Sequence, residues 1–154
     1  MKISELTRES LLIPKLSGKT MDEVLREMVE LLAADGVVRD RAMFMRLVLE
    51  REGLCSTCLG SSVAFPHARS ETIGRLTYVV GKRHASLAFP DDEHKARLFF
   101  LIAIPQFATG VYLQVLSGLA GFLHDKDLRK ELVDAETPKD MLRALKRMDR
   151  HLGQ

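Results

Sequence analysis

This sequence has almost no excess of positive or negative charge, few cysteines and no long apolar run. Its 154 residues contain 23 Lys and Arg against 21 Asp and Glu, which gives a formal net charge of +2 at pH 7. So small an excess does not favour a nucleic-acid surface or strong attraction to an anionic membrane. No segment reaches the apolar length of a membrane-spanning helix, and residues 1–8 lack a signal-peptide core. We therefore expect a cytoplasmic protein with no nucleic-acid partner and no direct insertion into a membrane.

Cysteine occurs only twice, at Cys55 and Cys58, with two residues between. In a reducing compartment this spacing fits a redox pair, half of a metal site, or two small apolar residues in the interior. A structural zinc site uses four ligands, and the sequence offers neither a second cysteine pair nor a closely spaced histidine pair. We favour the structural interpretation, and a thiol switch stays open beside any other function.

Internal repeats, low-complexity tracts and linkers are also missing, so we expect residues 1–154 to form a single domain. Segments with helical and strand-like patterns alternate along the chain. This alternation predicts an α/β fold built around a sheet.

Two helices are expected in the first third of the chain. Thr20 and Glu23 form a capping box that opens the first helix, and its apolar stripe runs through Leu32. Gly36 supplies a stop signal, because glycine adopts the left-handed conformation at little cost. The second helix is expected from about Asp40 to Glu52.

Strands and further helices are expected after residue 75. Leu76–Val80 and Arg97–Ile104 have the composition of strands, and the second is an unbroken apolar run that fits a central strand covered on both faces. Gly110–Leu123 has a helical pattern. A last helix is expected to open with Thr137 as N-cap and Pro138 in its first turn.

The segment with the clearest chemical potential is Val63–Arg69, with the sequence VAFPHAR. Pro66 restricts both itself and the residue before it, so His67 follows a stiff corner. A neutral imidazole is a good nucleophile near pH 7 and forms a phosphohistidine on attack at phosphorus. Arg69 offers a guanidinium for the phosphoryl charge, and the hydroxyl-rich segment Ser56–Ser62 offers further hydrogen-bond donors.

A family resemblance rests on these residues. The sequence from Glu50–Glu52 through Ser56, Thr57 and Gly60 to Val63–Arg69 resembles the active-site signature of enzyme IIA domains. The class is the fructose/mannitol class of the bacterial phosphotransferase system, which includes the nitrogen-regulatory form. The likeness extends to Met1–Leu6, Lys19–Leu32, the strand ending at Pro105, the helix containing Tyr112, and Asp127–Leu132.

The resemblance implies a fold, an activity and partners. The fold is a mixed β-sheet flanked by helices on both faces. The activity is protein-histidine phosphoryl transfer, in which His67 accepts phosphate from an HPr-like phosphocarrier and passes it to a downstream IIB domain or regulatory target. Neither a metal nor an organic cofactor is implied. The expected catalytic residues are His67, Arg69 and Thr57, and the expected phosphoryl pocket comprises Ser56, Ser61, Ser62 and Tyr112.

Three positions depart from the family pattern. Members often carry a second histidine where this chain has Tyr112, and usually have glycine where it has Cys58 and Ser62. These differences favour an alternative, a transfer-deficient binding module that contacts a kinase, a transporter or a transcription regulator. Which nitrogen of His67 would be phosphorylated depends on the hydrogen bond made by the other nitrogen.

Overall fold

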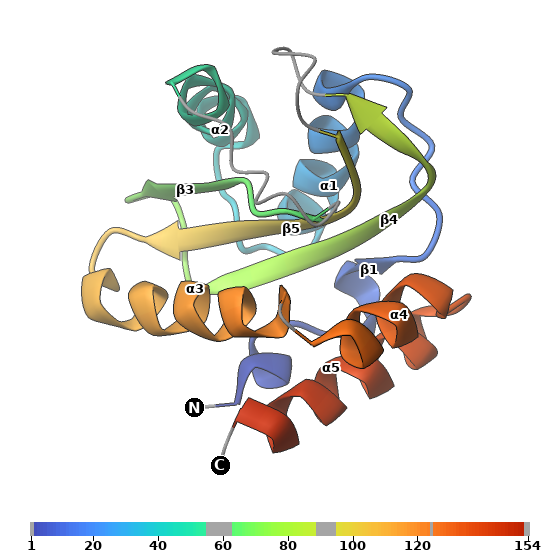
Figure 1. The fold of residues 1–154 in the computed structure, drawn as a ribbon. Helices are drawn as coiled ribbons and strands as arrows, with labels where there is room; N and C mark the ends of the chain where they lie inside the picture. The colour runs from blue at the N-terminus through green and yellow to red at the C-terminus, as the bar shows by residue number, and fades with distance from the viewer. Residues whose placement is uncertain (1, 55–62, 89–94, 124, 153–154) are drawn as a thin grey trace.

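A mixed five-stranded sheet lies between two layers of helices (Figure 1). The computed structural model describes residues 2–54, 63–88, 95–123 and 125–152. The strands lie in the order β1-β4-β5-β2, and β3 also pairs with β5. Among the described strand pairs, β4–β5 is antiparallel and the other three are parallel. The strands are β1 (Leu12–Ile13), β2 (Val63–Ala64), β3 (His67–Ser70), β4 (Thr77–Ala88) and β5 (Lys95–Pro105).

The central strand is β5, whose residues from Leu98 to Pro105 are all buried. This confirms the interpretation of that apolar run as a strand covered on both faces. Both long strands extend beyond the ranges expected from the sequence. The register of the β4–β5 pair shifts between Lys82 and Leu87. The regular hydrogen-bond pattern of the two strands is therefore interrupted within β4.

One face of the sheet is covered by α1 (Met21–Ala34) and α2 (Arg41–Leu54). The predicted capping box is present: the Glu23 amide donates to Thr20 Oγ1 at 3.1 Å. The carboxylate of Glu23 accepts from the Lys19 amide instead of the Thr20 amide. Gly36 has a φ of 81°, so the predicted stop signal is confirmed.

The opposite face is covered by α3 (Thr109–Leu123), α4 (Lys126–Asp134) and α5 (Pro138–Leu152). Asp125 caps α4 by accepting from the Asp127 and Leu128 amides. Thr137 accepts from the Asp140 amide at 3.1 Å, which confirms the predicted start of α5. The single domain with helices on both faces of a mixed sheet is therefore the fold that the sequence predicted.

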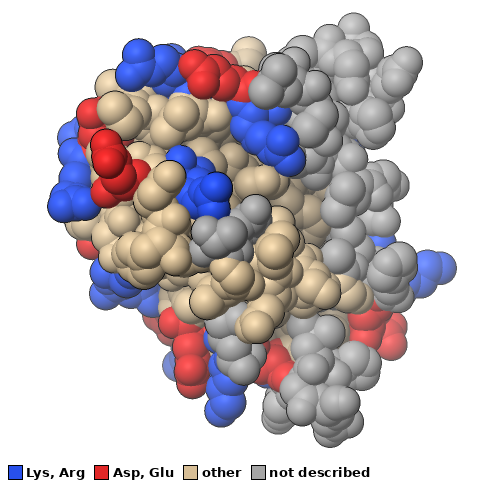
Figure 2. Space-filling model, turned by 90° about the vertical axis from the view of Figure 1, so that its left-hand side faces the viewer, with Lys and Arg blue, Asp and Glu red and all other residues tan. Residues whose placement is uncertain are grey.

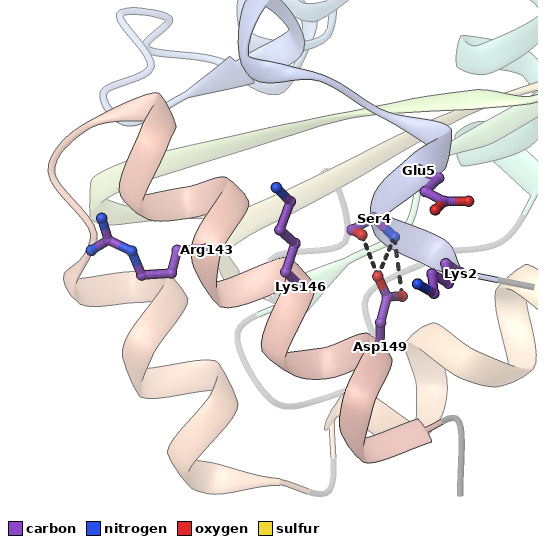
Figure 3. A pocket seen from close by; sticks show the side chains of 6 residues that line it. All are labelled: Lys2, Ser4, Glu5, Arg143, Lys146 and Asp149. Atoms are coloured by element: carbon purple, nitrogen blue, oxygen red, sulfur yellow. Dashed lines mark hydrogen bonds between the residues drawn. The ribbon is translucent and has the colours of Figure 1, made fainter.

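The N-terminal segment, with the short 3₁₀ helices Ile3–Leu6 and Glu9–Leu11, is tied to α5 and β4. The Ser4 amide donates to both carboxylate oxygens of Asp149, at 3.1 and 3.2 Å, and Ser4 Oγ donates to one of them (Figure 3). Tyr78 on β4 donates its hydroxyl proton to the Ile3 carbonyl at 2.9 Å. Figure 3 also shows that Arg143 and Lys146 of α5 line the hollow of about 430 Å³ beside this contact. No helix in the described part of the chain is long and apolar enough to cross a membrane.

Candidate functional site

His67 is the first residue of β3, at an edge of the sheet. It pairs with Ile102 of β5, and the Ile102 amide donates to the Pro66 carbonyl at 2.9 Å. The Phe65–Pro66 corner therefore lies between two short strands, β2 and β3, that both pair with β5. This pairing, added to the restricted backbone of Pro66, holds His67 in place. The sequence predicted the stiff corner, and the structure adds the strand that follows it.

One ring nitrogen of His67 is engaged by the backbone. Nδ1 lies 2.8 Å from the Phe65 carbonyl oxygen. Because a carbonyl only accepts, Nδ1 must carry the proton, and Nε2 then presents its lone pair. In the neutral ring, Nε2 is therefore the nitrogen whose lone pair is not engaged by this contact.

The environment of His67 favours the neutral ring. Its side chain is half-buried, and burial lowers its pKa from 6.5. The hydrogen bond to Phe65 acts in the opposite direction, and the positive charge of Arg51 lowers the pKa further. An imidazole that stays neutral below its ordinary pKa is available as a nucleophile over a wider range of pH.

Arg69 lies two residues along β3 from His67. The two residues alternate with the buried Ala68 and Ser70, so they lie on the same face of the strand, about 7 Å apart along it. Ala68 belongs to the core under α1 and α2, which leaves His67 and Arg69 on the face covered by α3. The strand therefore brings together the histidine and the arginine that the sequence singled out.

Arg51 belongs to α2, on the opposite face of the sheet, and is a further cation that influences His67; no role was predicted for it. It is exposed in the last turn of α2, which contacts β3, and it acts electrostatically on His67. The sequence contains only a weak signal for it: Arg51 falls within the segment that resembles the enzyme IIA signature. Its proximity to His67 depends on how α2 packs against the sheet, which the local pattern does not encode.

The remaining predicted site residues have no described side chains. Thr57, Ser56, Ser61 and Ser62 lie outside the described residues, as do Cys55 and Cys58. Tyr112 belongs to the first turns of α3, and its side chain is likewise outside the described part. Within the described residues, no group of three or more His, Cys, Asp or Glu is placed to hold a metal ion.

Exposed large apolar side chains follow the C-terminal end of β5 in the chain. Phe107 is 82% exposed, Val111 42% and Leu113 56%, and all three follow β5 directly in the chain. Figure 2 views the end of the molecule where β3 and the beginning of α3 lie, and shows a broad area without charged side chains, bordered by charged ones. Exposed large apolar side chains near one end of the sheet are candidates for contact with another protein. We call Phe107, Val111 and Leu113 the apolar patch.

Comparisons with known proteins agree on one family. The family described as "Phosphoenolpyruvate-dependent sugar phosphotransferase system, EIIA 2" matches residues 5–148. The PTS system fructose-specific EIIABC component of Bacillus subtilis is 28% identical over 151 residues, which are 97% of this chain and 24% of that protein. The PTS system fructose-specific EIIA component of Haloferax volcanii is 29% identical over 136 residues, which are 88% of each protein. The chain thus spans about a quarter of the Bacillus relative and most of the Haloferax one.

Solved structures give the same result. Nitrogen regulatory protein IIA-Ntr from Neisseria meningitidis superposes with a TM-score of 0.83 and 28% identity, covering 93% of this chain and 98% of that one. IIA mannitol from Escherichia coli superposes with a TM-score of 0.75 and 25% identity, covering 88% of this chain and 96% of that one. The fold and the sequence therefore lead to the same group of proteins.

Proposed function

This chain belongs to the EIIA 2 family of the phosphoenolpyruvate-dependent sugar phosphotransferase system, and we propose that it carries a phosphoryl group on Nε2 of His67. The donor is an HPr-like phosphocarrier, and the acceptor is a IIB domain or a regulatory target. The observation that carries the proposal is the 2.8 Å contact from His67 Nδ1 to the Phe65 carbonyl, which leaves Nε2 as the nucleophile.

The transfer is an in-line displacement at phosphorus. The Nε2 lone pair forms the new bond to phosphorus, while the bond from phosphorus to the donor atom of the phosphocarrier breaks and its electron pair stays on the donor. The product ring carries the phosphoryl group on Nε2 and a proton on Nδ1. The Phe65 carbonyl accepts the hydrogen bond from Nδ1–H throughout. The ring therefore does not have to reorient between accepting the phosphoryl group and releasing it.

Two arginines support the charge that is transferred. Arg69 shares a strand face with His67, and Arg51 already acts on the His67 ring electrostatically. Guanidinium groups suit phosphoryl oxygens because they form paired, charge-assisted hydrogen bonds. We assign Arg51 and Arg69 to stabilise the phosphoryl group, with Thr57 as a further donor. Ser56, Ser61, Ser62 and Tyr112 complete the pocket in this proposal.

The apolar patch is the docking surface for the phosphocarrier. It follows the end of β5 that pairs with His67 and Arg69, so a protein seated there reaches the histidine. Exposed aromatic and aliphatic side chains contribute most of the binding energy in many protein interfaces. Charges around the patch in Figure 2 then serve orientation and the rate of encounter.

Intact-mass analysis tests the carrier function. The protein is incubated with enzyme I, HPr and phosphoenolpyruvate, beside the variants His67→Ala and His84→Ala. We expect an acid-labile gain of one phosphoryl group in the parent and in His84→Ala, and none in His67→Ala. No gain in the parent, with HPr shown to be phosphorylated, would refute the carrier function.

A second function is favoured by the three departures from the family pattern, at Cys58, Ser62 and Tyr112. Tyr112 stands where members of the family often have a second histidine, and a phenol does not act as an imidazole does near neutral pH. In that case the domain binds a kinase, a transporter or a transcription regulator through the same surface without transferring phosphate. The mass experiment separates the two functions, because only the carrier gains a phosphoryl group.

A further inference from the structure

A hollow of about 730 Å³ lies near the start of β5, away from His67. Its lining comes from the loop after β1, the β4–β5 hairpin and the C-terminal end of α4, and includes Lys15, Lys82, Arg83, Arg97, Asp134 and Glu136. Arg97 is five residues before Ile102, the strand partner of His67. At about 3.3 Å per residue the two positions are roughly 16 Å apart along β5, so the hollow is separate from the proposed phosphoryl site.

The charge of the lining is unbalanced. Four Lys and Arg face two carboxylates, an excess of +2, whereas the whole chain has 23 Lys and Arg against 21 Asp and Glu, also +2. The residues outside this described lining are therefore formally balanced, with equal numbers of basic and acidic side chains. A positive cavity with low-dielectric walls concentrates anions.

An irregularity in β4 brings these cations together. In a regular strand successive side chains point to opposite faces, so Lys82 and Arg83 would not line the same hollow. The register shift that begins at Lys82 breaks this alternation. Bulges of this kind commonly re-aim side chains at the edge of functional sites.

Lys82 has a structural role within the lining. Its ammonium group donates to the Val133 carbonyl at 2.6 Å and to the Ala135 carbonyl, both at the end of α4. Burial lowers its pKa, the carboxylates of Asp134 and Glu136 act in the opposite direction, and the charge of Arg97 lowers it further. An anion bound in the hollow would act in the same direction as the two carboxylates.

The two arginines are held by neutral backbone carbonyls. Arg83 Nε donates to the Gly18 carbonyl at 2.9 Å, and Arg97 Nε donates to the Arg83 carbonyl at 3.3 Å. Within the described part of the chain, neither guanidinium forms an ion pair, whereas Asp134 is paired with Lys130 at 2.6 Å. Both guanidinium groups are thus positioned by backbone carbonyls, and among the described residues the carboxylate of Asp134 acts on Arg97 electrostatically without a direct ion pair.

We propose that this hollow binds a small phosphate monoester that also carries hydroxyl groups, as a sugar phosphate does. The phosphate is bound by Arg83, Arg97 and Lys15, because guanidinium and ammonium groups are the usual phosphate ligands. The hydroxyl groups donate to the carboxylates of Asp134 and Glu136. The volume lies within the range of small-molecule sites. Phosphoryl transfer at His67 is not required for this binding.

Isothermal titration calorimetry at low ionic strength tests the site with fructose 6-phosphate, inorganic phosphate and fructose. We expect saturable binding of fructose 6-phosphate, weaker binding of phosphate and none of fructose. Arg97→Ala is expected to weaken fructose 6-phosphate binding about tenfold or more, since it removes a charge-assisted contact. Lys15→Ala is expected to weaken it about two- to fivefold, and Lys15 is exposed, so this variant keeps its fold.

Two control variants make the result specific. Arg26→Ala removes an exposed arginine of α1 that does not line this hollow, and binding should be unchanged. His67→Ala should also bind normally, so failure of the carrier function and failure of this site are distinguishable. Three results would overturn the proposal: no saturable binding, equal affinity for phosphate and fructose 6-phosphate, or binding that Arg97→Ala and Lys15→Ala leave unchanged.

Discussion

Replacing Lys82 by methionine is a sharp test of how α4 is held against the sheet. The Lys82 side chain is 9% exposed, and its ammonium group donates to the Val133 and Ala135 carbonyls. Methionine keeps most of the volume but leaves two carbonyls at the end of α4 without this donor. Each unsatisfied buried acceptor costs about 1–3 kcal/mol. Removing a buried ammonium group offsets part of this cost, so we expect the free energy of unfolding to fall by about 2–3 kcal/mol.

Urea denaturation followed by circular dichroism measures the effect. For a chain of this length, a loss of that size lowers Tm by roughly 5–10 °C and shifts the urea midpoint with an unchanged m-value. Lys130→Met is the matched control, because Lys130 is 74% exposed and pairs only with the exposed Asp134. We expect Lys130→Met to lower the free energy of unfolding by less than about 0.5 kcal/mol. If both variants lost the same small free energy of unfolding, the two contacts from Lys82 to the carbonyls would not stabilise the end of α4.

Three further predictions concern the proposed site. By NMR, the pKa of His67 should lie below 6.5, because burial and Arg51 both disfavour the imidazolium form. Arg51→Ala should raise the titration midpoint of His67. An unchanged or lower midpoint in this variant would contradict the contribution of Arg51. Since the unfolded chain binds this proton more readily, the contribution of His67 to stability should fall as pH drops from above 6.5 through the lowered pKa. Phe107→Ser should raise the concentration of phosphorylated HPr needed for half-maximal transfer about tenfold while leaving Tm unchanged, because the side chain is 82% exposed. The control Lys139→Ala, on α5, should change neither value. If Phe107→Ser needed the same concentration of phosphorylated HPr as the parent protein, the apolar patch would not be part of the docking surface.

Local signals predicted much of this fold. The cap at Thr20, the stop at Gly36 and the N-cap at Thr137 depend on contacts within a few residues, and all three are present. The buried character of β5 was also readable, because strands covered on both faces carry unbroken apolar runs. Such features are predictable since they need no knowledge of distant partners.

Long-range features were not predictable in the same way. The bond from Ser4 to Asp149 joins residues 145 positions apart, and neither residue has a sequence pattern that announces it. The second half of β4, with Lys82 and Arg83, is polar and irregular, so its strand character comes from pairing with β5. The approach of Arg51 to His67 depends likewise on helix packing. Propensity and periodicity do not encode contacts of this kind.

The proposed phosphoryl site and the positive hollow lie at opposite ends of β5. At its C-terminal end the strand pairs with His67 and leads into the apolar patch, and at its N-terminal end Arg97 lines the positive hollow. The residues between, from Leu98 to Ile104, are 1% exposed or less, so the strand is a rigid part of the core and fixes the separation of its ends. A ligand in the hollow is held roughly 16 Å from the strand partner of His67, well beyond the 3–3.5 Å that a reacting atom needs. A molecule bound in the hollow would therefore be too far away to act as a phosphoryl donor or acceptor for His67.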